Sequence, residues 1–426
     1  MPGYLPRIVD NTIKASLETF GAVLLQGPRA AGKTTSGLQA AASSVRLDAS
    51  PDLVTLATIS PETVLAGAVP RLIDEWQLAP TVWNAVRHEV DRRGAPGQFI
   101  LTGSATPADD LTLHSGAGRY QSVTIRPMTL SESGNSTGSV ALTELLKGNS
   151  VAGLGGPTVQ DYAELIVRGG WPALVRDGGR SASDYLTSYL EDVARVDLPA
   201  SDLTVDPVRM LALIRALARN VASEASATSL GKEAEIGQGS EPPQTVSAQS
   251  VRKYLDALSR VFVIEEQPAW AVHLRSKVRV RVQPKWHFTD PSLAAAALRA
   301  SPASLLTDLN TLGSLFESLC VRDLRVFADA IGGKVYHYRD ESGLEVDIIL
   351  DLGDGSWSAF EVKLGGAEHI DSAAANLKKL REKVSQQRVD QLRSLNIITA
   401  GNLSFTRPDG VNVVALGHLG LASSAP

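Results

Sequence analysis

One short stretch constrains the fold of this chain more than any other. The sequence GPRAAGKTT, residues 27–35, fits the pattern G-x-x-x-x-G-K-[ST]. It directly follows the apolar run FGAVLLQ and precedes a segment with helical periodicity that starts near Lys33. In this order of strand, loop and helix, the N–H groups of a glycine-rich loop converge on phosphate oxygens. The chain is therefore expected to hold a phosphate group at the carboxyl edge of a parallel sheet.

The residues of this loop indicate how a nucleoside triphosphate would be held. Gly27 and Gly32 allow the backbone to curl, and the helix N-terminus adds positive potential. Lys33 is expected to reach the β- and γ-phosphates, and Thr34 to offer its hydroxyl to Mg²⁺. ATP and Mg²⁺ are thus the expected ligands. The expected nucleotide-binding set is Gly27, Pro28, Arg29, Ala30, Ala31, Gly32, Lys33, Thr34 and Thr35.

A second, acidic signature follows the next apolar strand. The segment PRLIDEW places Asp74 and Glu75 at the end of that strand. Taken alone, such a pair is typical of a solvated strand end. Together with the loop, it predicts that Asp74 helps to hold Mg²⁺ and that Glu75 polarises the attacking water. Lys33, Asp74 and Glu75 are therefore the predicted catalytic residues of an ATP hydrolase.

Three further polar residues have two interpretations each. The segment ILTGSA ends a third strand with Thr102 and Ser104, which are expected either to sense the γ-phosphate or to cap the next helix. Arg119, in GAGRYQS, is expected either to complete a nucleotide site, in its own chain or in a neighbour's, or to be a surface arginine. An assembly of several copies is accordingly an open expectation.

These motifs carry a family resemblance. GPRAAGKTT, LIDEWQLAP, ILTGSA and the spaced GR and RPMTLSE resemble prokaryotic AAA-superfamily ATPases whose C-terminal half was long a domain of unknown function. RGGWPALV, YLEDVARVD and PKWHFTDPSLAAAAL are similar to later segments of that family, in the same order. The resemblance covers most of the chain. It implies an α/β domain of AAA type that binds and hydrolyses ATP, a winged-helix middle and a nuclease-like C-terminal domain.

The length and composition fit several globular domains. A chain of 426 residues, 43% of them hydrophobic, has enough apolar material for several cores, and roughly two to four domains are expected. The net charge of −5 excludes a uniformly basic nucleic-acid coat, so any nucleic-acid contact needs a local basic patch. The single cysteine, Cys320, excludes a disulfide within the chain, and neither a signal peptide nor an apolar stretch of about 20 residues is found. A cytoplasmic protein without membrane contact is expected.

Shifts in composition divide the chain into four predicted segments. Residues 1–130 alternate apolar runs with helical patterns, as in a doubly wound parallel sheet. Residues 131–159 are rich in Gly, Ser and Thr and are interpreted as a linker around one short helix. Residues 160–300 are expected to form a helical and winged-helix-like region, and residues 301–426 a separate α/β domain.

The middle segment contains a candidate nucleic-acid contact. GKEAEIGQGSEPPQTVSAQSVRKYLDAL resembles a helix-turn-helix with residues 250–258 in its second helix, although its turn, residues 237–245, is longer than usual. In LRSKVRVRVQPK, basic residues alternate with valines, so a strand would place them on one face at about the spacing of successive phosphates. These residues are Arg275, Lys277, Arg279 and Arg281. A charged edge strand that resists aggregation is the open alternative.

A predicted hairpin near the end of the chain carries opposed carboxylates. DIILDLGDGSWSAFEVK contains two strands around the turn sequence GDG. If GDG forms a three-residue loop, Asp347 lies opposite Glu361 at about 5 Å. A two-residue loop would put them on opposite faces. Opposed carboxylates favour a cation such as Mg²⁺ or Mn²⁺, and Lys363 would stand beside it.

The spacing of these three residues carries a second resemblance. Asp347, Glu361 and Lys363, in the pattern D-x(13)-E-x-K, are similar to the PD-(D/E)XK nuclease superfamily. That resemblance implies a restriction-endonuclease-like core with catalytic Asp347, Glu361 and Lys363, in which Glu317 adds another metal-binding carboxylate. A salt-bridged surface hairpin is the alternative. The favoured hypothesis is thus an ATPase coupled to a nuclease-like domain that contacts nucleic acid, DNA rather than RNA. A regulatory nucleotide switch with an inactive binding module is the second hypothesis.

Overall fold

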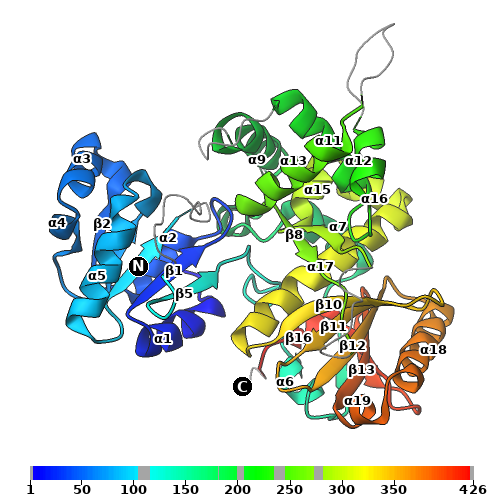
Figure 1. Cartoon of the computed structure of the whole chain (residues 1–426). Coiled ribbons are helices and arrows are strands. Elements are labelled where there is room, and N and C mark those ends of the chain that lie inside the picture. Colours follow the sequence, from blue (N-terminus) through cyan, green and yellow to red (C-terminus); the bar gives the residue numbers. More distant parts are fainter. Residues whose placement is uncertain are drawn as a thin grey trace, which may run out of the picture. The chain divides into compact units, whose positions relative to one another are not determined.

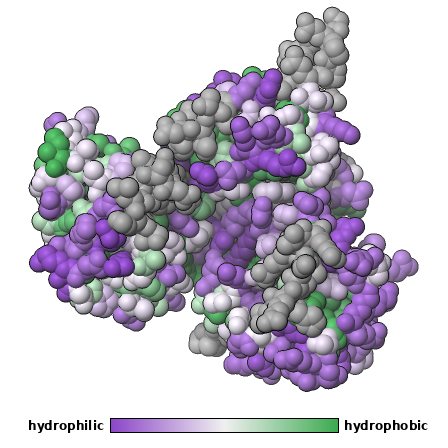
Figure 2. All heavy atoms as spheres, viewed as in Figure 1, coloured by the Kyte–Doolittle hydropathy of each residue, from purple (hydrophilic) through white to green (hydrophobic). Residues whose placement is uncertain are grey.

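The computed structural model describes residues 3–103, 116–180, 182–198, 206–234, 245–272 and 282–422, which divide into two compact units. The first unit comprises Met1–Pro127 with Arg260–Phe262, and the second comprises Met128–Ser259 with Val263–Pro426. Figure 1 labels many of their helices and strands. The face shown in Figure 2 is mainly hydrophilic, with small and separate apolar areas. Among the described residues, no helix is both long and apolar enough to cross a membrane.

The first unit is built on a five-stranded sheet with the strand order β2-β3-β4-β1-β5. All four strand pairs are parallel, which confirms the expected parallel α/β sheet. The three central strands are short and largely buried apolar runs, as is typical of a sheet covered on both faces. The strands are β1 (Ala22–Gln26), β2 (Ser43–Arg46), β3 (Arg71–Asp74), β4 (Phe99–Thr102) and β5 (Tyr120–Thr124).

Helices cover both faces of this sheet. Successive strand residues point to opposite faces, so Leu24 packs in one apolar core and Leu25 in the other. Helices α3, α4 and α5 contribute to the core of Leu24, and α1 and α2 to that of Leu25. The elements are α1 (Val9–Thr19), α2 (Lys33–Ala40), η1 (Leu47–Ala49), α3 (Pro51–Ile59), α4 (Pro61–Leu65), η2 (Trp76–Leu78) and α5 (Thr81–Arg93).

The second unit contains a helical region, as expected for the middle of the chain. Helices α11, α12 and α13 are followed by β8 and β9, which pair in antiparallel fashion. The alanine-rich α15 is a packed helix with most of its residues buried. The elements are α7 (Val159–Arg168), α8 (Pro172–Asp177), α9 (Ala182–Asp192), η3 (Val193–Asp197), α11 (Pro207–Arg219), α12 (Ala227–Glu233), α13 (Ala248–Arg260), β8 (Ile264–Gln267), β9 (Lys285–Phe288), α15 (Pro291–Ala297) and α16 (Pro302–Thr307).

A mixed seven-stranded sheet with the order β10-β11-β12-β13-β15-β14-β7 completes the second unit. Helix α17 contacts β10, β11 and β12, and α18 packs on the core that contains Trp270 and Trp357. The elements are α17 (Leu309–Ala330), β10 (Lys334–Arg339), β11 (Glu345–Asp351), β12 (Trp357–Lys363), α18 (Ala367–Lys383), α19 (Gln386–Asp390), β13 (Leu392–Thr399), β14 (Leu403–Thr406), β15 (Asn412–Ala415), η4 (Leu416–His418) and β16 (Leu419–Gly420).

Residues 131–159, expected to be a linker, belong to the sheets of this unit. Strand β7 (Ala152–Leu154) pairs with β14 at the edge of the seven-stranded sheet, and β6 (Val140–Ala141) pairs with β16. Only α6 (Leu142–Leu145) agrees with the short helix that was expected. Strands of two and three residues are too short for an alternating pattern to show in the sequence. The segment is therefore a structural part of the unit rather than a spacer.

The hairpin of β11 and β12 has the register that a three-residue loop predicts. Ile348 pairs with Phe360, and the pairing continues in step to the turn. Continued by one position, this register places Asp347 opposite Glu361, as expected from the GDG turn. The two-residue alternative is excluded, because it would shift every pair by one position.

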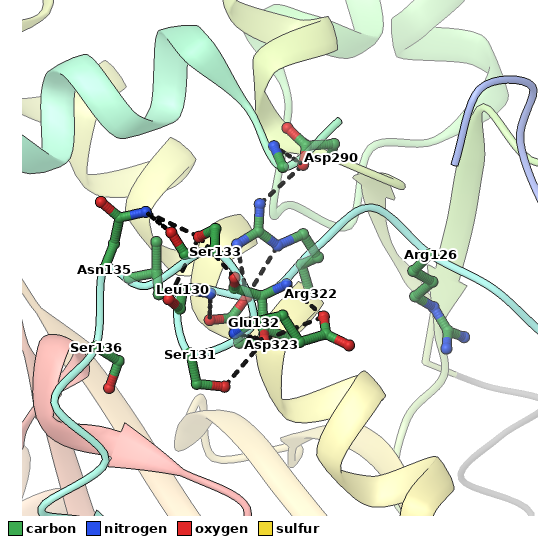
Figure 3. A network of polar contacts seen from close by, with 12 residues as sticks. Arg126, Leu130, Ser131, Glu132, Ser133, Asn135, Ser136, Asp290, Arg322 and Asp323 are labelled. Atoms are coloured by element: carbon green, nitrogen blue, oxygen red, sulfur yellow. Dashed lines mark hydrogen bonds and ion pairs between the residues drawn. The ribbon is translucent and has the colours of Figure 1, made fainter. Parts of the chain in front are cut away.

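A buried ion network lies where the chain enters the second unit (Figure 3). The guanidinium of Arg322, on α17, lies 2.8 Å from Oδ2 of Asp290 and 2.7 Å from Oδ1 of Asp323. Asp323 also accepts the N–H of Leu130 (2.9 Å), and Asp290 accepts that of Gly170 (3.0 Å). The three charged residues are all at most 3% exposed. The network therefore ties the chain at residue 130 to α17 and to the segment before α8.

Replacing Arg322 by Met is expected to destabilise the second unit by about 3–5 kcal/mol, because two buried carboxylates lose their cation. The measurement is hydrogen exchange of the α17 amides in the full chain. Arg381→Met, on the exposed side of α18, is the matched control and should leave that exchange unchanged. Equal protection of α17 in the two variants would show that the network contributes nothing.

Candidate functional site

The predicted phosphate loop connects β1 to α2 at the carboxyl edge of the parallel sheet. Gly27 and Gly32 have φ angles of 143° and 102°, which residues with side chains rarely adopt. At Gly27 the space is closed as well, since an added Cβ would lie 2.1 Å from the carbonyl oxygen of Ile125. Both glycines are therefore required by the path of the backbone.

Lys33 lies inside this loop. It is 5% exposed, and its Nζ donates to the carbonyl oxygens of Gly27 (3.0 Å) and Pro28 (2.8 Å). The ammonium group therefore stabilises the curled backbone. A triphosphate in the loop would offer it charged oxygens in exchange for these neutral ones, and charged oxygens are the stronger acceptors.

Asp74 brings three segments of the chain together at the end of β3. It is 1% exposed, and the strand register places Thr102 on one side of it and Arg46 on the other. Its Oδ1 accepts hydrogen bonds from the hydroxyls of Thr34 (2.8 Å) and Thr102, and the Nε of Arg46 lies 3.5 Å from its Oδ2. The two residues predicted to serve Mg²⁺, Thr34 and Asp74, are thus in direct contact.

The oxygen donors beside the loop fit a magnesium ion that is bound with a nucleotide. Mg²⁺ prefers oxygen ligands and takes one or two from the protein, the others coming from phosphates and water. The hydroxyl of Thr34 and the carboxylate of Asp74 are oxygens of this kind. Thr102, for which two roles were open, donates to Asp74 and so orients that carboxylate.

Glu75 has a backbone conformation that is rare for a residue with a side chain. Its φ is 57°, and its carboxylate accepts a hydrogen bond from Nε2 of Gln77. Strained backbone of this kind clusters at functional sites. Gln77 and Arg46 carry no motif that marks them as site residues, although both are polar residues at or just after the end of a strand.

Arg119 lies away from the phosphate loop of its own chain. Its backbone carbonyl accepts from the N–H of Ala22, at the start of β1, whereas the loop follows the other end of that strand. Its guanidinium pairs with Asp91, on α5, at 2.9 Å. This geometry disagrees with a nucleotide contact within the same chain, and a role in a neighbouring copy stays a prediction. Ser104 lies outside the described residues.

The residues of the D-x(13)-E-x-K pattern meet at one place in the second unit. Lys363 Nζ lies 2.7 Å from Glu361 Oε2 and 3.4 Å from Asp347 Oδ2. Asp347 Oδ2 also accepts the N–H of Val362 (2.8 Å). Glu361 is 2% exposed, and its Oε1 has no hydrogen-bond partner among the described residues. The arrangement is therefore a largely buried cluster rather than an exposed salt bridge.

A second lysine, Lys285 on β9, completes this cluster. Its Nζ lies 2.9 Å from Glu317 Oε1, 2.8 Å from Glu345 Oε1 and 3.7 Å from Asp347 Oδ1, and its side chain is 3% exposed. Lys285 was not among the predicted site residues. The only hint in the sequence was a lysine at the start of the short segment KWHF. In the structure this segment forms β9, and all four of its residues are buried.

Burial and mutual repulsion change the acidity of these groups. Burial, reinforced by the charge of Asp347, raises the pKa of Glu317 to about 7 and the pKa of Glu361 to about 8. Burial acts on Asp347 in the same direction, but Lys285 and Lys363 outweigh it and lower the pKa of that carboxyl. Burial would lower the pKa of Lys285, yet the surrounding carboxylates outweigh it and raise that pKa. Lys285 is therefore an ammonium ion at neutral pH.

The cluster differs from the metal site that was expected there. Glu317, Asp347 and Glu361 are gathered, but no three or more Asp, Glu, His or Cys side chains in the described ranges are arranged to hold a metal ion. The ammonium of Lys285 contacts both Glu317 and Asp347. Glu317 and Asp347 therefore both lie within ion-pair distance of Lys285, and the metal site stays a prediction.

The basic stretch of the middle segment lies outside the described residues. It falls between β8 and β9 in the chain and comprises Arg275, Lys277, Arg279 and Arg281. The turn expected at residues 237–245 is outside as well, except for residue 245. The helix expected at residues 250–258 is part of α13. Nucleic-acid binding by the basic stretch stays a prediction.

Gly27→Ala is expected to weaken ATP binding, because the added methyl group collides with Ile125 and the φ angle is unfavourable. Strain of about 1–3 kcal/mol corresponds to a loss of roughly 10- to 100-fold in affinity. The measurement is titration with a fluorescent ATP analogue and Mg²⁺. Gly313→Ala, on α17, is the control, since its nearest neighbour is Leu364 Cδ1 at 4.0 Å. Unchanged affinity in Gly27→Ala would contradict the assignment of the loop.

Comparisons with known proteins identify relatives of most of the chain. The uncharacterized protein Rv2008c of Mycobacterium tuberculosis and the uncharacterized protein Mb2031c of Mycobacterium bovis are each 26% identical to it over 412 residues, which is 94% of this chain and 81% of theirs. The Walker-type ATPase PABY2304 of Pyrococcus abyssi is similar over 68% of this chain and 94% of its own, with 16% identity and a TM-score of 0.41. The Orc1 protein of Aeropyrum pernix, solved in complex with DNA, is similar over 70% of this chain and 95% of its own, with 11% identity and a TM-score of 0.27.

Three family models match consecutive parts of the chain. Residues 159–304 and 312–419 match two models described as domains of unknown function, DUF8612 and DUF4143. Residues 19–134 match a model described as an AAA domain. This last range contains the parallel sheet and the phosphate loop described above. The chain therefore carries an N-terminal P-loop ATPase domain of AAA type, followed by two domains to which the models assign no function.

Proposed function

We propose that this chain hydrolyses ATP to ADP and phosphate with Mg²⁺, and that it couples this reaction to a nuclease-like C-terminal domain that contacts nucleic acid. The contact between Thr34 and Asp74 carries the first part of the proposal. It joins the hydroxyl and the carboxylate that P-loop ATPases use to hold Mg²⁺. The two residues are 40 positions apart in the chain, so the fold has brought them together.

The side chains around the loop have complementary roles in this proposal. Lys33 offers its ammonium to the β- and γ-phosphate oxygens. Thr34 and Asp74 hold the magnesium ion, which supplies positive charge to the phosphates when it is bound. Glu75, oriented by Gln77, accepts a hydrogen bond from the water that attacks the γ-phosphorus as ADP leaves. Each role falls on a residue at the carboxyl edge of the sheet.

The second part of the proposal concerns the domains that follow. Helix α17, strands β10 to β12, helix α18 and strand β13 succeed one another in the order of a restriction-endonuclease-like core. Asp347, Glu361 and Lys363 lie together on two of its strands. We interpret α11 to α13 with β8 and β9 as a winged-helix-like module. Both interpretations favour nucleic acid as the partner, with DNA preferred over RNA.

A regulatory nucleotide switch is the second candidate, and one observation favours it. In a switch, the C-terminal domain binds its partner without cleaving it. The ammonium of Lys285 lies close to Glu317 and Asp347, where a nuclease of this kind would use a metal ion to activate water. The cluster then serves to fold and position the domain.

Lys33→Ala is expected to lower ATP turnover by at least about 100-fold, because the loop loses the cation that faces the γ-phosphate. Turnover is measured as phosphate release at saturating Mg²⁺ and ATP. Lys14→Ala, an exposed lysine on α1, is the matched control and should hydrolyse ATP like the wild type. Equal turnover in the two variants would remove the ATPase proposal.

The two candidates for the C-terminal domain predict different fates for a plasmid or single-stranded DNA. A nuclease should cleave it with Mg²⁺ or Mn²⁺, and Lys363→Ala should slow cleavage by at least about 100-fold, since Glu361 and Asp347 lose their ammonium partner. Lys334→Ala, an exposed lysine on β10, should cleave normally. DNA that stays intact with the wild type in every nucleotide state would reject the nuclease and leave the switch.

A further inference from the structure

Lys285 is held in the carboxylate cluster by backbone pairing on both sides of its strand. Within the pair β8 and β9, Lys285 lies opposite Gln267. On the other side, the next residue, Trp286, forms backbone hydrogen bonds with Ala222 (2.9 Å) and Ser223 (3.1 Å). The strand is buried over all four of its residues. The backbone position from which the side chain of Lys285 reaches the carboxylates is therefore fixed by its strand, and the side chain is 3% exposed.

The ammonium group lies among the oxygens through which Glu317, Glu345 and Asp347 could together hold a divalent ion. It has three N–H donors. Two of its contacts are short, to Glu317 (2.9 Å) and Glu345 (2.8 Å), and a third carboxylate, that of Asp347, lies at 3.7 Å. Mg²⁺ binds oxygens at about 2.0–2.1 Å, so it cannot share them with an ammonium group in their midst. An ion held by these same three oxygens would require Lys285 to leave.

We infer that Lys285 replaces a divalent cation in this cluster. Its ammonium holds the position among Glu317, Glu345 and Asp347, so that the C-terminal domain takes up neither Mg²⁺ nor Mn²⁺ there. The inference rests on the switch candidate and explains why such a domain would bind without cleaving. It does not depend on whether the phosphate loop hydrolyses ATP.

Removal of the ammonium group should turn the cluster into a metal site. Lys285→Met keeps most of the buried stem and leaves three carboxylates around a gap, and carboxylate oxygens suit Mn²⁺. The test is Mn²⁺ binding by the full chain without nucleotide, followed through the EPR signal of free Mn²⁺. Lys334→Met is the matched control, because this lysine lies on β10, which pairs with β11, and is exposed. Asp347→Asn, alone and combined with Lys285→Met, identifies binding at the cluster.

The expected result is a gain of binding in one variant only. The wild type and Lys334→Met should show no Asp347-dependent binding up to about 1 mM Mn²⁺. Lys285→Met should gain one Mn²⁺ site with an affinity at least about 10-fold tighter than that 1 mM limit, and Asp347→Asn should remove this site. Mn²⁺ that binds the wild type and is lost in Asp347→Asn would overturn the inference, and so would a folded Lys285→Met without a new site.

The experiment remains decisive if Lys285→Met does not fold. Equal Mn²⁺ binding by the wild type and Asp347→Asn then supports the inference, and weaker binding by Asp347→Asn overturns it. Because neither ATP nor DNA is present, this outcome is separate from the turnover and cleavage measurements. Cleavage of DNA by the wild type would reject the switch candidate on which the inference rests, whereas Mn²⁺ binding that depends on Asp347 overturns the inference itself.

Discussion

The structure depends on neutralising carboxylates that the fold has removed from water. A buried carboxylate without a partner costs several kcal/mol, so each one must meet a cation or hydrogen-bond donors. Asp74 meets two threonine hydroxyls, Asp323 meets an arginine and a backbone N–H, and Asp347 meets two lysines. The positions of these partners fix how β3, α17 and β11 are placed within their units.

The kind of partner distinguishes the two polar sites of the chain. A hydroxyl group both donates and accepts, so Thr34 can give up its hydrogen bond to Asp74 and offer its oxygen to an ion. An ammonium group only donates, so Lys285 satisfies Glu317 and Asp347 without ever becoming a ligand. Under the proposals made here, the oxygens beside the phosphate loop can pass to an ion bound with a nucleotide, whereas Glu317 and Asp347 are held by a lysine of the chain itself.

Local sequence patterns predicted the phosphate loop and the hairpin register. They did not predict which residues far apart in the chain contact each other. The phosphate loop is contiguous, and the pairing of Asp347 with Glu361 follows from the length of one turn. Lys285 and Glu317 are 32 positions apart, as are Asp290 and Arg322, and a single sequence does not show which buried charges meet over such distances. Strands β6 and β7 were missed for a different reason, because two or three residues carry no periodicity.

The C-terminal sheet is not a contiguous piece of the polypeptide. Its outermost strand, β7, comes from residues 152–154 and pairs with β14, which lies some distance further along the chain. A fragment cut near residue 301 would lack that strand and leave unpaired the edge of β14 that faces away from β15, where Leu403 is exposed. Unpaired edges of this kind template intermolecular sheet growth. A recombinant fragment of this domain therefore has to carry the earlier strand with it, by fusion or by co-expression, to remain monomeric.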